Sequence, residues 1–329
     1  MSWGAMFMIL VVGGAGYIGS HVVKHLVQTA QVVVYDNLST GHKEAVDPKA
    51  IFIEGDLADE QRLTQVFTLF PIEGVMHFAS VSGVAESIRN PQRHYENNVA
   101  ATLSLLKVMH NCQVKNIMFS SSSATYAPSD SLLHEESPVA PTNPYGRSNY
   151  FVEQILQDYS HAYQFNCTVL RHFNVAGASA DGEIGESHLP ETHLIPTVLQ
   201  HLRGEIETLK LYGNTYPTED GTCIRDYVHV EDLANAHILA LEALLQRDAA
   251  FEIYNIGNEL GFSVKEVIEQ CEQVTGRSAN VELTHKRAGD PAILVASTKK
   301  IQRELGWQPE KSLQQMIEHA WHWQKRAVY

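Results

Sequence analysis

The chain has 329 residues and a mass of 36.7 kDa, about twice the size of a typical single domain, so we expect two lobes or one large α/β unit. Hydrophobic residues make up 44% and charged residues 19% of the sequence, a composition that excludes intrinsic disorder. The 24 Lys and Arg residues against 38 Asp and Glu residues leave a formal net charge of −14. Because this charge repels phosphate backbones, we expect no nucleic-acid partner, whereas a small anionic ligand stays compatible with it.

The cysteine content and the hydropathy pattern indicate a cytoplasmic protein with no membrane partner. No apolar run reaches membrane-spanning length. The apolar run Met6–Val12 lacks the basic flank and the cleavage site of a signal peptide and leads directly into glycines, so we interpret it as a buried first strand. The cysteines are far apart and form no Cys-x-x-Cys pair, which favours reduced thiols. They are Cys112, Cys167, Cys223 and Cys271.

Short apolar runs rich in Val and Ile alternate with helical patterns in the first half of the chain. The runs have the composition of fully buried parallel strands, and the helical stretches Pro91–Met109 and Pro144–Tyr163 each begin at a proline. This alternation predicts an α/β fold with a doubly wound parallel sheet, which binds ligands at the carboxyl ends of its strands. The expected strands are Met8–Val12, Gln31–Tyr35, Ala50–Ile53, Gly74–Phe78, Lys115–Ser120 and Asn166–Leu170.

The pattern changes after Asn174. Gly, Pro, Thr, His and Asp accumulate over residues 175–222, with a short helix expected at Ile195–Arg203. Further helices are expected at Val230–Leu245, Ser263–Thr275 and Leu313–Arg326. This part of the chain is typical of a smaller α/β lobe that binds a substrate.

A glycine motif directly follows the first expected strand. Its spacing is Gly13-x-x-Gly16-x-x-Gly19, and it opens a helix, whose N-terminal N–H groups and positive dipole suit a pyrophosphate. The second strand ends at Asp36, where a carboxylate accepts hydrogen bonds from ribose hydroxyls and repels a 2′-phosphate. The motif therefore predicts a dinucleotide site that prefers NAD to NADP.

A second signal lies at Tyr145, which opens a helix about two dozen residues after the serine run Ser120–Ser123. A Tyr and a Ser that converge beside a nicotinamide suit the oxidation of a carbinol, because the Tyr takes the hydroxyl proton while the Ser hydrogen-bonds the oxygen. On its own this pattern is common and would carry little weight.

Together these motifs resemble the extended short-chain dehydrogenase/reductase family, and within it most closely the UDP-glucose 4-epimerases. The resemblance extends from Gly13 nearly to Trp323. The blocks that carry it are Gly13–His21, Asp36–Gly41, Thr142–Arg147, Phe173–Ala178, Tyr216–Thr222, Arg225–Val230 and Arg287–Ala292.

By matching positions, the resemblance implies NAD as the cofactor and a UDP-sugar as the substrate, with Tyr145 as the acid/base, Ser122 as its hydroxyl partner and Asn149 at a third catalytic position. Arginines suit a diphosphate and carboxylates suit ribose hydroxyls. The implied NAD-contacting residues are Gly13, Gly16, Tyr17, Ile18, Gly19, Asp36, Asn37, Asp56, Leu57, Phe78, Ala79, Asn97, Tyr145, Asn149 and His172. The implied substrate-contacting residues are Ser122, Tyr145, Asn174, Leu194, Tyr212, Arg225, Arg287, Asp290 and Leu294.

The sequence departs from the family at Asn149, where the family carries a Lys four residues after the Tyr. A charge about 5 Å from a phenolate, at an effective dielectric constant of about 20, is worth roughly 3 kcal/mol, or about two pKa units. Asn149 supplies no such charge, so we expect a site that binds but transfers protons slowly. His172 replaces a Tyr of the family, and whether its imidazolium supplies part of the missing charge stays open. Ser123 stays open as an alternative to Ser122.

The predicted activity is that of an isomerase, which inverts C4 of a UDP-hexose and interconverts UDP-glucose and UDP-galactose through a transient 4-keto sugar. The alternatives are a UDP-glucuronate or UDP-N-acetylhexosamine 4-epimerase and, because of Asn149, a catalytically weakened nucleotide-sugar-binding protein. Leu294, at a position that limits sugar bulk in the family, neither demands nor excludes an N-acetylated sugar. A 4,6-dehydratase would need an Asp-Glu pair, and Ser123–Tyr126 contains none.

The predicted organisation is an NAD-binding Rossmann domain at residues 1–174, to which a segment near residues 225–255 returns, and a UDP-sugar-binding lobe at residues 175–329. The resemblance implies a homodimer that pairs Pro91–Met109 and Pro144–Tyr163 across a two-fold axis. His21 and His25 are spaced like a metal-binding pair on a helix, but no third ligand is placed nearby, so we expect no metal.

Overall fold

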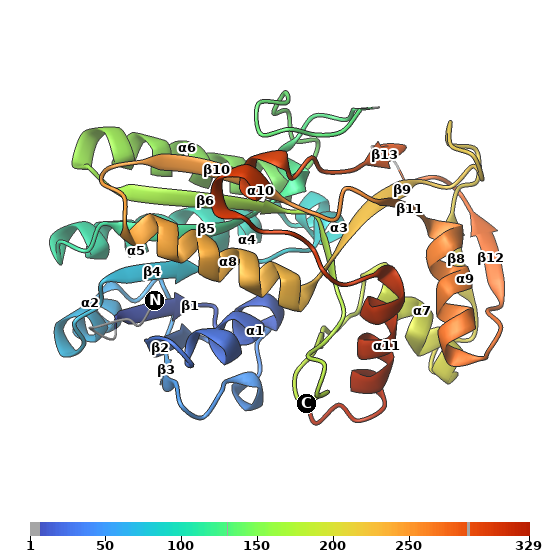
Figure 1. Ribbon diagram of the computed structural model, residues 1–329, viewed down its shortest axis with the longest axis horizontal. Coiled ribbons are helices and arrows are strands. Elements are labelled where there is room, and N and C mark those ends of the chain that lie inside the picture. Colours follow the sequence, from blue (N-terminus) through green and yellow to red (C-terminus); the bar gives the residue numbers. More distant parts are fainter. Residues whose placement is uncertain (1–6, 130, 288–289) are drawn as a thin grey trace. The chain divides into compact units, whose positions relative to one another are not determined.

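The computed structural model describes residues 7–129, 131–287 and 290–329 (Figure 1). The chain divides into two compact units. The first unit contains the described residues up to Ala127 together with Pro138–Arg171 and Ala234–Tyr254. The second unit contains Pro128–Ser137, His172–Leu233 and Asn255–Tyr329. Residues 128–137, which fall inside the range expected for the NAD-binding domain, are thus part of the second unit.

The first unit is built on a seven-stranded sheet with the strand order β10-β6-β5-β4-β1-β2-β3. Every residue of β1 is buried, as expected for a central strand covered on both faces. From β1 the chain runs to β2 and β3 on one side and then returns to β4 on the other side of β1. The strand order therefore reverses at β1, which marks the place where such sheets bind ligands. The strands are β1 (Met8–Val12), β2 (Gln31–Asp36), β3 (Ile51–Glu54), β4 (Gly74–His77), β5 (Asn116–Ser122), β6 (Asn166–His172) and β10 (Phe251–Ile256).

Helices cover both faces of this sheet (Figure 1). On one face Leu10 of the sheet belongs to a buried cluster with Leu63 of α2, Leu105 of α5 and Val152 of α6. On the other face α1 and α8 pack near β1. The helices are α1 (Tyr17–Leu26), α2 (Glu60–Leu69), α5 (Ala101–Asn111), α6 (Pro144–Tyr163) and α8 (Val230–Leu245), with the short elements η1 (Lys43–Ala45), α3 (Val84–Arg89), α4 (Pro91–His94) and η3 (Ser123–Thr125).

The prediction of an α/β doubly wound fold is confirmed. All six expected strands are present with ends within two residues of those predicted, and α6 and α8 have the predicted ends. One helix differs, because the stretch expected as Pro91–Met109 is interrupted by a π-helical segment, η2 (Tyr95–Ala100). The Thr102 hydroxyl donates to the Asn98 carbonyl at 2.6 Å, an added bond of a kind that accompanies irregular helical turns.

The second unit has β9 (Ile224–His229) at its centre. It pairs antiparallel with β11 (Gly261–Ser263) and parallel with β7 (Asn174–Ala176) and β13 (Ile293–Leu294). A separate parallel pair joins β8 (Leu209–Tyr212) and β12 (Val281–Thr284). The predicted helices α7 (Leu194–Arg203), α9 (Val264–Thr275) and α11 (Leu313–Gln324) surround a core with Val198, Val267 and Met316, and α10 (Lys299–Leu305) adds a shorter helix.

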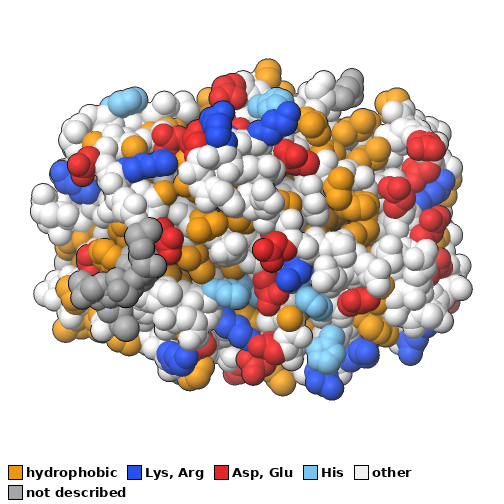
Figure 2. Space-filling model, in the orientation of Figure 1, with side chains coloured by type: hydrophobic (Ala, Val, Ile, Leu, Met, Phe, Trp, Pro, Cys, Tyr) orange, Lys and Arg blue, Asp and Glu red, His pale blue; other side chains and the backbone are white. Residues whose placement is uncertain are grey.

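Two surface properties bear on partners. On the face drawn in Figure 2, acidic and basic side chains are interspersed, so this face carries no continuous basic field of the kind that nucleic-acid binding requires. Among the helices of the described residues, none combines the length and the apolar character that crossing a membrane demands.

Candidate active site

The glycine turn after β1 brings three chain segments into close contact. Gly13 has φ of +77°, and a Cβ atom there would lie 2.4 Å from the backbone nitrogen of Ala79. A Cβ atom on Gly19 would lie 2.3 Å from the carbonyl oxygen of Gly13. Only glycine fits these two positions. The turn leads into α1, whose N-cap Gly16 makes no side-chain cap and whose first turn has no acidic residue, so its N–H groups can receive a phosphate.

Asp36, at the end of β2, fixes the same turn. Its Oδ2 accepts the N–H of Ala15 at 2.9 Å and its Oδ1 accepts the N–H of Leu38 at 2.8 Å. Burial raises the pKa of Asp36, and the two backbone hydrogen bonds oppose that rise. Beside it, Asn37 Nδ2 donates to Asp56 Oδ2 at 2.7 Å. The structure thus gathers carboxylates next to the glycine turn, an arrangement that suits ribose hydroxyls and disfavours a 2′-phosphate.

The segment after β4 lies against the glycine turn through Ala79. The ring of Phe78 contacts that of His237, with the centroids 4.9 Å apart. Asn98, which the sequence analysis did not single out, bonds the N–H of Val81 at 2.8 Å and the hydroxyl of Ser148 at 3.0 Å. It therefore joins this segment to η2 and α6. The neighbouring Asn97, which was predicted to contact the cofactor, directs its Nδ2 to the carbonyl of Arg93 at 2.9 Å.

The proposed catalytic groups come together at the end of β5 and the start of α6. Ser122 is the last residue of β5, Tyr145 lies in the first turn of α6, and Asn149 lies one turn later. Burial raises the pKa of Tyr145, while hydrogen bonding from the Ser122 and Asn149 side chains acts in the opposite direction. Asn149 Nδ2 also donates to the carbonyl of Tyr145 at 3.0 Å. Of the two candidate serines, Ser122 is the one whose side chain hydrogen-bonds the phenol.

A buried ion pair lies directly behind these groups, and the sequence analysis missed it. Glu153 of α6 binds Arg171 of β6 through two bonds and accepts the Ser121 hydroxyl at 2.6 Å. The Arg171 guanidinium also lies over the ring of Tyr126, 4.7 Å from its centroid. Ser121 precedes Ser122 and Glu153 shares a helix with Tyr145, so this pair ties together the two elements that carry the catalytic groups. The available signal was an acid placed between Val152 and Leu156 on the buried face of the helix.

The second unit holds most of the residues expected to bind the substrate. Arg225 of β9 forms an ion pair with Asp290, and its guanidinium is largely buried. Leu294 of β13 pairs with Arg225 in the sheet register. The guanidinium of Arg287 lies over the ring of Tyr212, 4.0 Å from its centroid.

The remaining predicted contacts of the second unit lie on separate elements. Asn174 begins β7 and pairs with Tyr227, and Leu194 begins α7. His172 bonds the carbonyl of Phe173 through Nδ1 at 3.1 Å. Burial lowers the pKa of His172 to about 4, so its ring is uncharged at neutral pH. The suggestion that an imidazolium at His172 replaces the missing Lys charge is therefore disfavoured.

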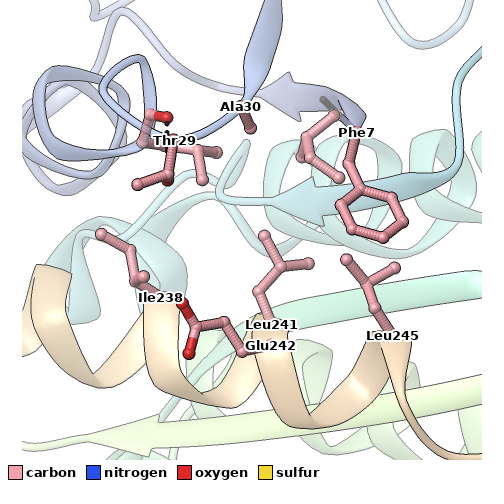
Figure 3. A pocket seen from close by; sticks show the side chains of 9 residues that line it. Phe7, Thr29, Ala30, Ile238, Leu241, Glu242 and Leu245 are labelled. Atoms are coloured by element: carbon pink, nitrogen blue, oxygen red, sulfur yellow. Dashed lines mark hydrogen bonds between the residues drawn. The ribbon is translucent and has the colours of Figure 1, made fainter. Parts of the chain in front are cut away.

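Two other features are a small recess and a pair of histidines on α1. A recess between the end of α1 and α8 is lined by apolar side chains such as Phe7, Leu241 and Leu245 (Figure 3) and has a volume of about 10 Å³, room for at most one water. His21 of the His21/His25 pair is buried, and its Nδ1 bonds the carbonyl of Tyr17 at 2.8 Å. The recess is therefore too small for an organic ligand, and the backbone of α1 itself holds one ring nitrogen of His21.

A Rossmann sheet with a glycine turn and a Tyr–Ser pair defines a class of dinucleotide-dependent enzymes. The chain belongs to the NAD dependent epimerase/dehydratase family, which matches residues 9–257. The UDP-glucose 4-epimerase of Halalkalibacterium halodurans is 50% identical over 96% of this chain and 95% of that protein. The crystal structure of UDP-glucose 4-epimerase from Brucella ovis in complex with NAD matches with a TM-score of 0.93 and 43% identity, over 96% of this chain and 98% of that one. The crystal structure of UDP-glucose 4-epimerase from Bifidobacterium longum in complex with NAD+ and UDP matches with a TM-score of 0.92 and 35% identity, over 97% of this chain and 98% of that one. The predicted family is confirmed.

Proposed function

We propose that this chain is an isomerase that inverts C4 of a UDP-hexose, interconverting UDP-glucose and UDP-galactose, with NAD as a retained cofactor. The observation that carries the proposal is the buried group of Ser122, Tyr145 and Asn149 in a unit that also holds the glycine turn. The similarity to UDP-glucose 4-epimerases along nearly the whole chain supports the choice of substrate.

The residues present fit NAD. The glycine turn is a cradle that a Cβ atom at Gly13 or Gly19 would fill, and the uncapped start of α1, with Tyr17 and Ile18, would hold the pyrophosphate. Asp36 and Asn37 would hold the adenosine ribose. Further contacts would come from Asp56, Leu57, Phe78, Ala79, Asn97, Tyr145, Asn149 and His172. When bound, NAD supplies a reversible two-electron acceptor for the carbon that is inverted.

The chain's own residues handle the proton. Tyr145 would take the proton of the sugar 4-hydroxyl and later return it, while Ser122 hydrogen-bonds the same oxygen. The resulting 4-keto sugar turns over within the site and is reduced on its other face. Because burial raises the pKa of Tyr145 and Asn149 brings no charge, the phenol is a weak base at rest. We therefore propose that turnover is slower than a Lys at position 149 would allow.

Binding of the UDP moiety is assigned to the second unit. Arg225 and Arg287 would bind the diphosphate through charge-assisted hydrogen bonds, and Asp290 would accept ribose hydroxyls. Asn174, Leu194 and Tyr212 would complete the nucleotide contacts, and Leu294 would limit the bulk of the sugar. The ion pair between Arg225 and Asp290 holds both side chains in place before the nucleotide arrives.

The same proposal includes a cytoplasmic homodimer. Leu103 of α5 and Phe151 of α6 are 41% and 45% exposed, and Ile88 of α3 is 62% exposed. Large apolar side chains exposed on neighbouring helices favour a protein interface. All four cysteines are free thiols, which suits a reducing compartment. Light scattering of the purified chain measures the oligomeric state directly.

The test is conversion of UDP-galactose to UDP-glucose by the purified chain, with enzyme-bound NAD quantified after denaturation. We expect bound NAD and measurable turnover, and we expect Tyr145→Phe to retain NAD and lose turnover. Bound NAD without turnover of UDP-galactose, UDP-N-acetylgalactosamine or UDP-galacturonate by the parent chain would favour the nucleotide-sugar-binding alternative that Asn149 raises. Chains purified without any bound NAD, and unable to take it up, would contradict the proposal itself.

A further inference from the structure

We propose that Glu186, His188, Glu191 and His193 form a site for one divalent transition-metal ion of the zinc class. These residues lie in the second unit, in the segment that leads into α7. Each offers one ligand atom, and the four atoms lie within 4.8 Å of one another. None of the four is itself assigned to NAD, to the nucleotide or to the reacting hydroxyl, but His193 directly precedes Leu194 and interacts electrostatically with His172. Occupancy by an ion can be measured without any assay of turnover.

Most separations within the group come near those of tetrahedral coordination, and the hydrogen bond between His193 and Glu186 has to open to admit an ion. A zinc ion bound at about 2.0–2.1 Å separates neighbouring ligand atoms by about 3.3 Å. His188 Nδ1 lies 3.2 Å from Glu186 Oε1 and 3.9 Å from Glu191 Oε2. His193 Nδ1 lies 3.7 Å from Glu191 Oε1 and is in direct contact with Glu186 Oε1. The two imidazole rings are steeply inclined, at 74°, so they approach the centre from different directions.

The charge and chemistry of the group also suit such an ion. Glu186 raises the pKa of His193 to about 9, so an ion that binds here displaces a proton from that ring. The two carboxylates and two neutral imidazoles then carry a charge of −2, which a divalent cation neutralises, and mixed N and O ligands suit zinc and its neighbours. Within the described part of the chain, no Lys or Arg forms an ion pair with Glu186 or Glu191. The Glu186 and Glu191 side chains are 4% and 5% exposed and that of His193 is 52% exposed, which leaves an entry route from solvent.

The backbone that carries these ligands is held by the last helix. Trp323 Nε1 donates to the carbonyl of Glu186 at 3.0 Å, and a Cβ atom on Gly185 would lie 2.4 Å from the Trp323 ring. Glu191 Oε1 accepts the N–H of His193 at 2.8 Å, leaving Oε2 for an ion. The ligands are therefore supported before an ion binds, as metal sites require.

A second His and Glu group in this unit is the main competitor. The ligand atoms of His229, Glu231 and His319 also lie close together, but this group offers three ligands and the proposed site offers four. His229 Nδ1 already accepts the N–H of Glu231 at 3.0 Å, and its Nε2 lies 2.9 Å from His319 Nδ1. With one nitrogen of His229 occupied by backbone, this group is a hydrogen-bonded pair, and it offers a matched control.

The experiment uses the full chain, freed of any affinity tag and stripped of metal by a chelator. Zinc is titrated in competition with a chromophoric chelator, and cobalt is titrated while its visible absorption, which is intense in tetrahedral sites, is followed. We expect one ion per chain. The double variant His188→Gln/His193→Gln should bind zinc more than about 100-fold more weakly, because removing supporting groups alone costs 10–100-fold. His319→Gln should bind like the parent.

Circular dichroism and thermal unfolding in chelator confirm that the variants are folded, and the single variant His188→Gln replaces the double variant if that fails to fold. Zinc at 100 times its Kd should stabilise the parent by about 2.7 kcal/mol and leave the double variant unchanged. Substoichiometric binding, equal affinity in parent and double variant, or loss of binding in His319→Gln alone would each overturn the proposal.

Discussion

Glu153 and Arg171 form a buried two-point ion pair, with Nε to Oε1 at 3.0 Å and Nη2 to Oε2 at 2.6 Å. Both side chains are at most 3% exposed. The same Glu153 Oε1 accepts the Ser121 hydroxyl, so one carboxylate connects β5, α6 and β6. Since Ser122 and Tyr145 belong to β5 and α6, the ion pair fixes the two elements that carry the proposed catalytic groups.

We expect Glu153→Gln to lower the free energy of unfolding by about 3–5 kcal/mol, because it leaves the Arg171 charge buried without a counter-ion. Denaturant unfolding of the purified chain measures the change. The matched control is Glu60→Gln, which breaks the exposed Lys107–Glu60 pair and should cost at most about 1 kcal/mol. Equal effects of the two substitutions would show that the buried pair adds nothing specific.

Replacing Asn149 by Lys tests the missing charge. A Lys at this position should lower the pKa of Tyr145 by about two units if its charge lies about 5 Å from the phenolate. Turnover of UDP-galactose should then rise about tenfold. In the pH–rate profile, the apparent pKa of the group that must be deprotonated for activity should move to lower pH. The control is Asn149→Met, which adds length without charge. If Met accelerates turnover as much as Lys does, the charge is not the cause.

The sequence predicted the first unit well because its strands are buried on both faces and read as continuous apolar runs, as β1 does. Strand β9 was missed because polar and apolar residues do not alternate regularly in its sequence, Ile-Arg-Asp-Tyr-Val-His. The segment pairs with three strands that are distant in the sequence. The π-helical segment at residues 95–100 contains Asn98, whose side chain bonds Val81 and Ser148, contacts that no periodicity reveals. Likewise Glu186 and His193 converge through a loop without a repeating pattern, so their spacing in the sequence does not reveal the group.

Gly13→Ala should abolish NAD retention. Its Cβ would lie 2.4 Å from the Ala79 nitrogen and 2.7 Å from the Ala79 Cα, and backbone atoms cannot move aside as a side chain can. Gly276→Ala is the control, since Gly276 also has positive φ but has no atom within 4 Å of an added methyl group, so it should lose only about 1–2 kcal/mol. NAD released by denaturation and the free energy of unfolding are measured for both. Full NAD content in Gly13→Ala would contradict the assigned role of the turn.

His77 should make folding stability depend on pH. Its Nε2 bonds Thr102 Oγ1 at 2.8 Å, and because that hydroxyl donates to the Asn98 carbonyl, the His77 Nε2 must be the donor. His77 Nδ1 is buried with no hydrogen-bond partner among the described residues. Burial lowers the pKa of His77 from 6.5 to about 4, whereas the unfolded chain takes up a proton near pH 6.5.

The unfolded state therefore binds more protons than the folded state between pH 6.5 and pH 4. The contribution of His77 is fully present above pH 6.5, is lost as the pH falls, and levels off below pH 4, for a total of about 3 kcal/mol. His77→Gln retains a donor toward Thr102. As the pH is lowered through this range, its free energy of unfolding should fall less steeply than that of the parent, and the two slopes should differ by at most the value that corresponds to one bound proton. Urea unfolding at half-unit pH steps gives both slopes, and identical slopes in parent and variant would place the His77 pKa near its ordinary value.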